Sequence, residues 1–380
     1  MTLDETMSPP RVLEPASSSE LSEMMRARKE PYRIAGGGTR GDLSAVQGTD
    51  LRTTRISGIS LYEPGALTLV AAAGTPLREI EETLAENRQR LAFEPPDLRD
   101  LLGREGISTL GGVVASNASG PRRVAVGACR DFILGVTFVD GTGTIVKNGG
   151  RVMKNVTGYD LVKLLTGSRG TLGVLTEIAL KVLPEPEAEA TIALAAEDAR
   201  HAVRVMTGAI GTPFDVTGAA YDPESKSVFI RIEGFADSVR YRAQCLSQGF
   251  EGASSRLIED RDESASIWRD IRDARSLAGL DADIWKISVR PTDSPDLITN
   301  IAPRRYLLDW SGGLVWIATD PGTDVRSQFR GVSGHASLIR NSSPTTIPRF
   351  HPEPAPLQQL STGIRRKFDP HGILNPGLFA

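Results

Sequence analysis

The sequence predicts an α+β protein made of two parts, and three observations support this prediction. The chain has 380 residues, more than one ordinary hydrophobic core accommodates. In residues 107–181, two loops rich in small residues, 109–120 and 167–173, bracket a β-hairpin around the turn Asp140-Gly141-Thr142-Gly143. Beyond a Pro- and Glu-rich segment at 183–189, the expected order is strand, helix, strand, strand, helix, strand, the split unit of a ferredoxin-like fold.

Composition places the chain among globular α/β proteins. Hydrophobic residues make up 40% of the sequence and charged residues 24%. The formal net charge of -3 argues against a general nucleic-acid binder. The two cysteines, Cys129 and Cys245, provide no disulfide framework, zinc site or cluster ligation by this chain alone. A reducing, cytoplasmic location fits these features.

The N-terminal residues and the hydropathy pattern favour no direct membrane insertion. The start MTLDETMSPPRVLEP carries acids and prolines where a signal peptide needs a basic start and an apolar run. No stretch approaches the length of a membrane span. We therefore expect a cytoplasmic protein whose contact with the inner membrane, if any, is made through partner subunits.

A glycine-rich loop follows the first expected strand, residues 32–35, which itself follows an expected helix at 18–28. The loop, residues 36–42, can turn several peptide N–H groups toward one anion, while Thr39 adds a hydroxyl group and Arg40 a positive charge. Gly36, Gly38 and Gly41 also spell GxGxxG. A dinucleotide-binding Rossmann unit is nevertheless excluded, because residues 42–47 leave no room for its crossover helix.

The next elements are a strand pair and a helix. Residues 54–61 and 67–73 are expected to form strands joined by a turn at 63–66. Thr75 is the expected N-cap of the helix, with Pro76 at its first position. The central stretch comes after this helix and carries a local positive excess, which favours anionic ligands. Between residues 122 and 181, nine basic residues (122, 123, 130, 147, 151, 154, 163, 169, 181) stand against four acids (131, 140, 160, 177).

The second part is expected to hold two successive ferredoxin-like units in one antiparallel sheet. The first unit has strands at 191–195, 215–221, 227–233 and 255–259 and helices at 197–210 and 236–248. After a helix at 267–277, the second has strands at 284–289, 306–310, 314–318 and 335–340 and helices at 294–301 and 323–329. A helix at 355–367 and a tight turn at 368–377 end the chain and are expected to dock back on the body.

The sequence assigns no catalytic residue and no metal site. The four histidines, His201, His335, His351 and His371, are scattered, and no HxxH or HExxH spacing exists. The nucleophile elbow GxSxG and the phosphate-binding loop GxxxxGK[ST] are also absent. What remains is a site made largely of backbone, which suits a large, flat cofactor that brings its own chemistry. In particular, we expect the peptide N–H groups of Gly111 and Gly112 to meet this cofactor.

Five motifs, taken together, resemble one known family. They are IAGGGTRGD, GISTLGGVVASNASG, GACRDFILGVTFVDGTG, KNVTGYDLVKLLTGSRGTLGVLTEIALK and FDPHGILNPG. The chain is similar to flavoproteins with the vanillyl-alcohol-oxidase (PCMH) type FAD-binding domain, and most of all to the smaller flavin-binding subunits of bacterial glycolate oxidases. The resemblance implies an FAD-binding domain at 1–184, an α+β cap of two ferredoxin-like units at 190–340, and a C-terminal segment at 341–380 that returns to the FAD domain.

The resemblance also implies the residues that bind FAD. They are Gly36, Gly37, Gly38, Thr39, Arg40, Gly41, Asp42, Pro96, Thr109, Leu110, Gly111, Gly112, Ala115, Ser116, Asn117, Gly173, Val174 and Asn375. Covalently flavinylated members carry His in the first glycine loop or Cys in the second. Neither residue occurs in these loops here, so noncovalent FAD is expected.

The implied activity is that of an FAD-dependent oxidoreductase acting on CH–OH groups, which oxidises glycolate, a small 2-hydroxy acid, to glyoxylate. The larger 2-hydroxy-acid dehydrogenases of the family carry GHxGDGNxH at the substrate, whereas this chain has only Gly334-His335-Ala336-Ser337-Leu338. Turnover is therefore expected to need a second flavin subunit and an iron–sulfur subunit. Two alternatives stay open: a self-sufficient FAD oxidoreductase with another substrate, and a non-catalytic scaffold subunit.

Overall fold

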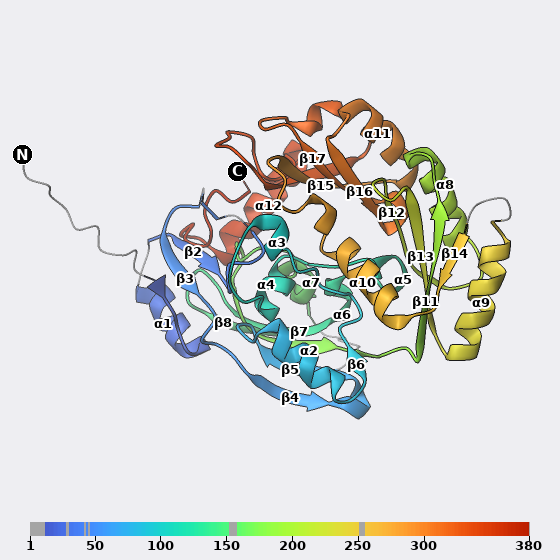
Figure 1. The fold of residues 1–380 in the computed structure, drawn as a ribbon. Helices are drawn as coiled ribbons and strands as arrows, with labels where there is room; N and C mark the ends of the chain where they lie inside the picture. The colour runs from blue at the N-terminus through green and yellow to red at the C-terminus, as the bar shows by residue number, and fades with distance from the viewer. Residues whose placement is uncertain are drawn as a thin grey trace, which may run out of the picture.

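The computed structural model describes residues 12–27, 30–41, 43–44, 46–151, 158–250 and 255–379. Figure 1 shows two lobes: an N-terminal lobe built on two small sheets, and a second lobe built on one large sheet. The C-terminal helix and turn lie with the first lobe.

The first lobe contains a parallel and an antiparallel sheet. The parallel sheet has the order β1-β3-β2, with strands β1 (Val12–Leu13), β3 (Thr49–Arg52) and β2 (Tyr32–Ala35). The antiparallel sheet has the order β4-β5-β9-β7-β8, with strands β4 (Ile59–Glu63), β5 (Thr68–Ala72), β9 (Val174–Lys181), β7 (Ile133–Val139) and β8 (Ile145–Gly149). The expected hairpin is thus confirmed as the β7–β8 pair. Strand β3 was not expected from the sequence.

Short helices cover the five-stranded sheet and bury one apolar core with it. The helices of this lobe are α1 (Ser18–Ala27), α2 (Leu77–Ala85), α3 (Arg99–Leu102), α4 (Leu110–Ala115), α5 (Arg123–Val126), α6 (Cys129–Phe132) and α7 (Leu161–Leu165). A two-residue strand, β6 (Gln89–Arg90), pairs with β10 (Leu183–Pro184). The core includes Ile80, Val113, Phe138 and Ile178, all fully buried.

Two expectations about the helices of this lobe are wrong. Pro76, not Thr75, occupies the N-cap of α2, and the Thr75 hydroxyl instead donates to the Ala72 carbonyl at 2.7 Å. Part of the 109–120 stretch, expected to be a loop, forms α4, because the Thr109 side chain accepts a hydrogen bond from the Gly112 N–H and caps the helix.

The second lobe is an eight-stranded antiparallel sheet with the order β14-β11-β13-β12-β16-β17-β15-β18. One half comprises β11 (Ala188–Ala195), β12 (Val216–Asp222), β13 (Ser227–Gly234) and β14 (Ser255–Ile258). The other half comprises β15 (Asp283–Val289), β16 (Arg305–Asp309), β17 (Leu314–Thr319) and β18 (Gly334–Arg340). Each half repeats the same strand order, with its first strand between its third and fourth.

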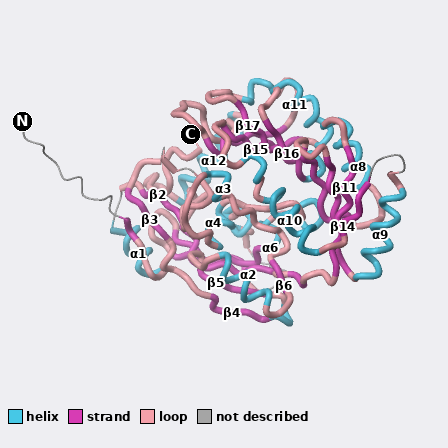
Figure 2. Tube along the Cα trace, viewed as in Figure 1, coloured by secondary structure: helices cyan, strands magenta, loops and turns pink. Residues whose placement is uncertain are grey.

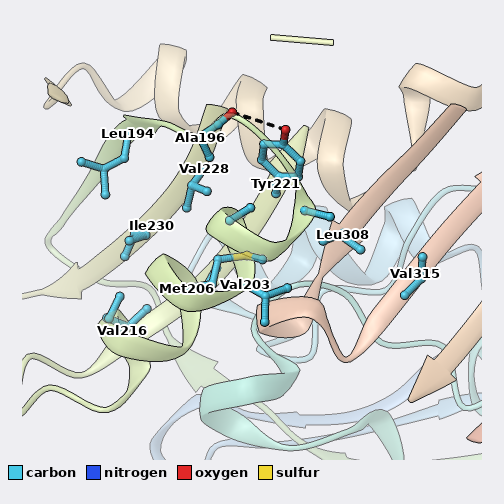
Figure 3. Packing of buried hydrophobic residues seen from close by; sticks show 14 of the residues in the cluster. Leu194, Ala196, Val203, Met206, Val216, Tyr221, Val228, Ile230, Leu308 and Val315 are labelled. Atoms are coloured by element: carbon cyan, nitrogen blue, oxygen red, sulfur yellow. Dashed lines mark hydrogen bonds between the residues drawn. The ribbon is translucent and has the colours of Figure 1, made fainter. Parts of the chain in front are cut away.

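Helices α8 (Ala199–Ile210), α9 (Ala236–Gln248) and α11 (Ser294–Ile301) follow the outer side of this sheet (Figure 2), and α10 (Arg261–Arg272) lies toward the first lobe (Figure 1). The expected helix at 323–329 is a short 3-10 helix, η5 (Val325–Gln328). In Figure 3, Val203 and Met206 of α8 lie in the core with Tyr221, whose hydroxyl group donates to the Ala196 carbonyl at 3.4 Å.

The C-terminal segment docks on the first lobe through its turn. Helix α12 (Ala355–Phe368) buries no residue fully, but the turn after it places Ile373 and Leu374 in the core around β2. The Tyr32 N–H donates to the Ile373 carbonyl at 2.7 Å, and the Asn375 N–H donates to the Tyr32 carbonyl at 3.1 Å. Residues more than 300 positions apart are thereby joined at the strand that leads into the first glycine loop.

Buried ion pairs hold the two lobes together. Arg231 of β13 pairs with Glu94 of the first lobe at 2.8 Å, and Glu233 of β13 pairs with Arg122 and with Arg90. The side chains of Arg231 and Glu233 are each only 2% exposed. These ion pairs therefore connect the two lobes, and removing one partner would leave a buried charge without a counter-charge.

Candidate cofactor-binding site

A cavity of about 300 Å³ opens in the first lobe, and three chain segments line it. The first is the end of β2 with the loop after it and β3, the second runs from Arg104 into α4, and the third is the loop before β9. These are the two glycine-bearing loops singled out in the sequence, together with the glycine loop after the first strand.

The first glycine loop supplies free backbone donors. Within the described part of the chain, the peptide N–H groups of residues 36–41 donate to no protein acceptor. Their carbonyl groups, in contrast, are held from behind: Arg52 Nη1 donates to the Gly36 carbonyl at 3.3 Å and Arg104 Nη1 to the Gly41 carbonyl at 2.5 Å. A run of successive unpaired N–H groups beside a cavity suits the oxygens of a phosphate or diphosphate.

Glycine is required at the centre of this loop. A Cβ atom at Gly37 would lie 1.7 Å from the Ile107 carbonyl oxygen, a distance that no side chain tolerates. Gly38 has a φ of +77°, in the left-handed region that favours glycine. The loop is therefore in close contact with the segment that leads into α4. Both line the same cavity.

The second segment contributes packing rather than free donors. The Gly111 N–H donates to the Ala73 carbonyl at 2.6 Å, and the Gly112 N–H to the Thr109 hydroxyl at 3.3 Å. The expectation that these two N–H groups meet the cofactor is therefore wrong. Gly111 needs to be glycine because a Cβ there would lie 2.8 Å from the Ala73 carbonyl oxygen, and this packing brings α4 close to the sheet.

The third segment approaches from the opposite side. Gly170 has a φ of +76°, and a Cβ at Gly173 would lie 2.5 Å from the Phe138 ring. The Arg169 side chain lines the cavity, stacks 4.9 Å from the centroid of the Phe350 ring, and burial lowers its pKa to about 10.

Most of the residues implied by the resemblance line this cavity. Those that do are Gly36, Gly37, Gly38, Thr39, Arg40, Gly41, Thr109, Gly111, Gly112, Ala115, Ser116, Gly173 and Val174. Pro96, Leu110, Asn117 and Asn375 do not appear in its wall. Asp42 lies outside the described residues.

Asn375 and Asn117 instead support the wall from behind. The Asn375 side chain accepts a hydrogen bond from the Ile34 N–H at 2.6 Å and donates to the Arg169 carbonyl at 2.8 Å. It thus joins β2, which enters the first loop, to the third segment. Asn117 Oδ1 accepts a hydrogen bond from the Arg130 N–H at 3.0 Å.

Several cations of the cavity wall were missed by sequence reasoning. Arg33, Arg52, Arg104 and Arg169 all line it. Only a local excess of basic residues marked Arg169, and no motif marked the other three. They come together because strand pairing and loop packing bring distant segments to one place.

The described residues offer no metal site, and the Asp50 carboxyl group of the cavity wall is held in an ion pair with Arg33. No group of three or more potential metal ligands exists among them. No histidine or cysteine contributes to the described lining, and burial raises the pKa of the Cys129 thiol to about 12, so that this group stays protonated. Among the described helices, none has both the length and the apolar character of a membrane span.

Comparison with known proteins gives a consistent family. Residues 9–149 match the family model described as "FAD binding domain". The chain is 34% identical over 353 residues to glycolate oxidase subunit GlcE of Escherichia coli. The aligned residues cover 92% of this chain and 92% of that protein. It is 29% identical over 272 residues to D-lactate dehydrogenase of Anaerostipes hadrus, covering 68% of this chain and 55% of that protein. With glycolate oxidase subunit GlcD of Bacillus subtilis it shares 30% identity over 190 residues, 48% of this chain and 39% of that protein.

The fold is found again among solved structures. Alkyldihydroxyacetonephosphate synthase superposes with a TM-score of 0.68 at 16% identity, over 96% of this chain and 76% of that one. At this identity the likeness concerns the fold alone. Two of the three segments that line the cavity lie within residues 9–149, the range that matches the FAD binding domain model.

Proposed function

Since the chain belongs to the family of glycolate oxidase FAD-binding subunits, which have the PCMH-type α+β fold, we propose that it serves in a complex that oxidises glycolate to glyoxylate. FAD is its cofactor, and the chain is an FAD-dependent oxidoreductase of the kind that acts on CH–OH groups. The observation that carries the proposal is the row of unpaired N–H groups at residues 36–41 beside the cavity.

The residues of this chain fit the two ends of FAD differently. The N–H groups of the first glycine loop would hold the pyrophosphate, and Arg40, Arg104 and Arg169 would balance its charge. Gly112, Ser116, Gly170 and Val174 would leave room for the flavin ring, because they present small or flat surfaces to the cavity. FAD, once bound, supplies the acceptor for a pair of electrons and a proton from the substrate carbinol.

The chain is expected to assemble with partner subunits. The names GlcE and GlcD denote subunits, so an assembly of several chains is supported. We propose that the partners are a second flavin subunit and an iron–sulfur subunit, and that any contact with a membrane is made through them. The absence of GHxGDGNxH from the sequence, and of a histidine from the described cavity wall, supports the view that turnover needs a partner.

We also propose that residues 1–184 and 341–380 form the FAD-binding domain and residues 190–340 a cap. The return of Ile373, Leu374 and Asn375 to β2 supports including the C-terminal segment with the first domain. The repeated strand order supports reading the cap as two ferredoxin-like units.

The experiment compares the chain alone with the chain co-expressed with its partner subunits. The isolated protein should show a flavin spectrum but near-background glycolate-dependent dye reduction, and the co-purified complex should reduce the dye. Full activity of the isolated chain would contradict the subunit role. A co-purified, flavin-loaded complex that is inactive on glycolate would contradict the substrate.

A further inference from the structure

Lys286 lies at an unusual place for an unpaired charge, in the middle of strand β15 in the large sheet. Its neighbours Trp285 and Ile287 point to the helix-covered core. Lys286 points to the opposite face, where Trp316 and Leu307 pack with Leu101 of the first lobe. This face of the sheet therefore looks toward the FAD-binding lobe.

Strand β18, which pairs with β15, places further polar residues on this face of the sheet. In the β15–β18 pair, Lys286 lies opposite Ser337, and Ser288 lies opposite His335. Partners directly across an antiparallel pair present their side chains on the same face. Two hydroxyl groups, an imidazole and an ammonium group thus share one surface of a sheet whose other surface is apolar.

No carboxylate neutralises Lys286 within the described part of the chain. Its Nζ lies 5.4 Å from the centroid of the Trp310 ring and 5.3 Å from that of Trp316. Burial, and then the charges of Arg123 and Arg169, lower its pKa to about 8. The acid that acts on it is Asp309, but the Asp309 carboxylate accepts the Trp310 N–H at 2.7 Å as a helix cap and forms no ion pair with Lys286.

Other cations of the first lobe contact the same indole ring or lower the pKa of Lys286 by their charge. The Arg123 guanidinium stacks 4.4 Å from the centroid of the Trp310 ring, so Arg123 and Lys286 contact one indole. The Arg40 atoms Nε and Nη1 are buried without a hydrogen-bond partner. Neither Arg40, Arg123 nor Arg169 has an ion-pair partner among the described residues.

This cluster contrasts with the other buried cations of the interface. Arg122, Arg231 and Arg272 each lie against a carboxylate, of Glu233, Glu94 and Asp273 respectively. Like charges held close together in a buried place repel one another. Gathering several without a counter-charge is costly unless an anion occupies the space between them.

We propose that Lys286 and Arg123, with Trp310 between them, form a binding site for a small carboxylate at the junction of the two lobes, next to the FAD cavity. Resting on the proposed function, the ligand is a 2-hydroxy carboxylate, whose carboxylate pairs with the two cations while Ser288, Ser337 and His335 offer partners for its hydroxyl group. Arg40 and Arg169 line the FAD cavity and extend the positive field from it toward Lys286. All the residues named for this site belong to this chain.

The test measures oxalate binding to the purified, FAD-loaded chain, because oxalate resembles glycolate but offers no carbinol hydrogen to remove. Flavin absorbance and tryptophan fluorescence report binding, the second because Trp310 and Trp316 flank Lys286. Lys286→Met and Arg123→Gln should each raise the oxalate Kd tenfold or more. Lys226→Met, in an exposed turn of the same sheet, should leave it unchanged.

Three results would overturn the site. They are oxalate binding no tighter than chloride at equal ionic strength, an unaltered Kd in both folded variants, and a Kd unaltered while the flavin midpoint potential falls. The last would mean that the cations serve only the reduced flavin. Inactivity of the assembled complex on glycolate would instead contradict the proposed function, since oxalate binding is measured without turnover.

Discussion

At the scale of single residues, the absence of a side chain at Gly37 maintains the shape of the cofactor cavity. The first glycine loop is pressed so closely on the Ile107 carbonyl that a methyl group would force the two segments apart. The free N–H groups of the loop would then no longer be directed together toward the cavity.

We expect Gly37→Ala to lower FAD occupancy tenfold or more, which corresponds to about 1.4 kcal/mol of binding free energy. Flavin absorbance per polypeptide after gel filtration measures it, and circular dichroism checks the fold. Gly65→Ala is the matched control, because a Cβ there would meet nothing within 4 Å. Equal flavin content in both variants would show that the loop does not hold the cofactor.

A pH dependence follows from Lys286. Its pKa is lowered to about 8, so the ammonium form that attracts a carboxylate is lost as the pH rises through this value. Oxalate affinity of the parent should be level below about pH 7.5 and fall above pH 8. The bound anion raises the pKa of Lys286, so at higher pH the deprotonated Lys286 must take up a proton before oxalate binds. Among the neighbouring groups, His335 has a lowered pKa, Asp309 one of about 7, and Arg40 and Arg169 values of about 10. In Lys286→Met the fall near pH 8 should disappear; if it persists, another group causes it.

At the scale of elements, the contact between β13 and the first lobe depends on Glu233. Although burial alone would raise the pKa of this carboxyl group, the charges of Arg231, Arg122 and Arg90 outweigh that effect and lower it to about 2. The carboxylate therefore contributes stability above its unfolded pKa of about 4.3, and this contribution is lost as the pH falls through about 2.

Glu233→Gln should cost about 3 kcal/mol of unfolding free energy at pH 7, because it leaves Arg122 buried beside a neutral group. Urea unfolding measures the loss, which should shrink below about pH 4.5 and be small near pH 2. The control is Glu263→Gln, whose carboxylate is 39% exposed and pairs with an exposed Arg256. A cost for Glu233→Gln as small as that of the control would show that the network does not stabilise the junction.

The C-terminal segment offers a contrast between a helix and its turn. Leu360 of α12 is 64% exposed, whereas Ile373 in the turn is fully buried. Leu360→Ala should change the unfolding free energy by less than about 0.5 kcal/mol, and Ile373→Ala should cost about 2–5 kcal/mol. The reverse order in thermal or urea unfolding would mean that α12, rather than the turn, anchors the segment.

At the scale of the whole molecule, FAD is expected to be held without a covalent bond. No cysteine or histidine contributes to the described cavity wall, and Cys129 is buried elsewhere with a pKa of about 12. Acid precipitation should therefore release all the flavin into the supernatant. Yellow colour that remains in the washed pellet would contradict this expectation.

The sequence by itself determined many of the elements, and its motifs indicated the family that binds FAD. The 3.6- and 2-residue periodicities predicted α9, α11, β2 and the β7–β8 hairpin with their residues, because these depend on local propensity and on which face is apolar. The glycine loop at 36–41 was predicted as a phosphate cradle from the sequence, because a row of free N–H groups requires only a short stretch of backbone.

Only the tertiary structure decided how the loops are used. Gly111 and Gly112 read as ligand-facing, yet their N–H groups bond Ala73 and Thr109, because the position of α4 depends on how it packs on β5. Lys286 and Arg123 lie 163 positions apart and meet at Trp310 only after both lobes have folded and joined. Charges so distant in the chain carry no local pattern, so no reading of the sequence alone could bring them together.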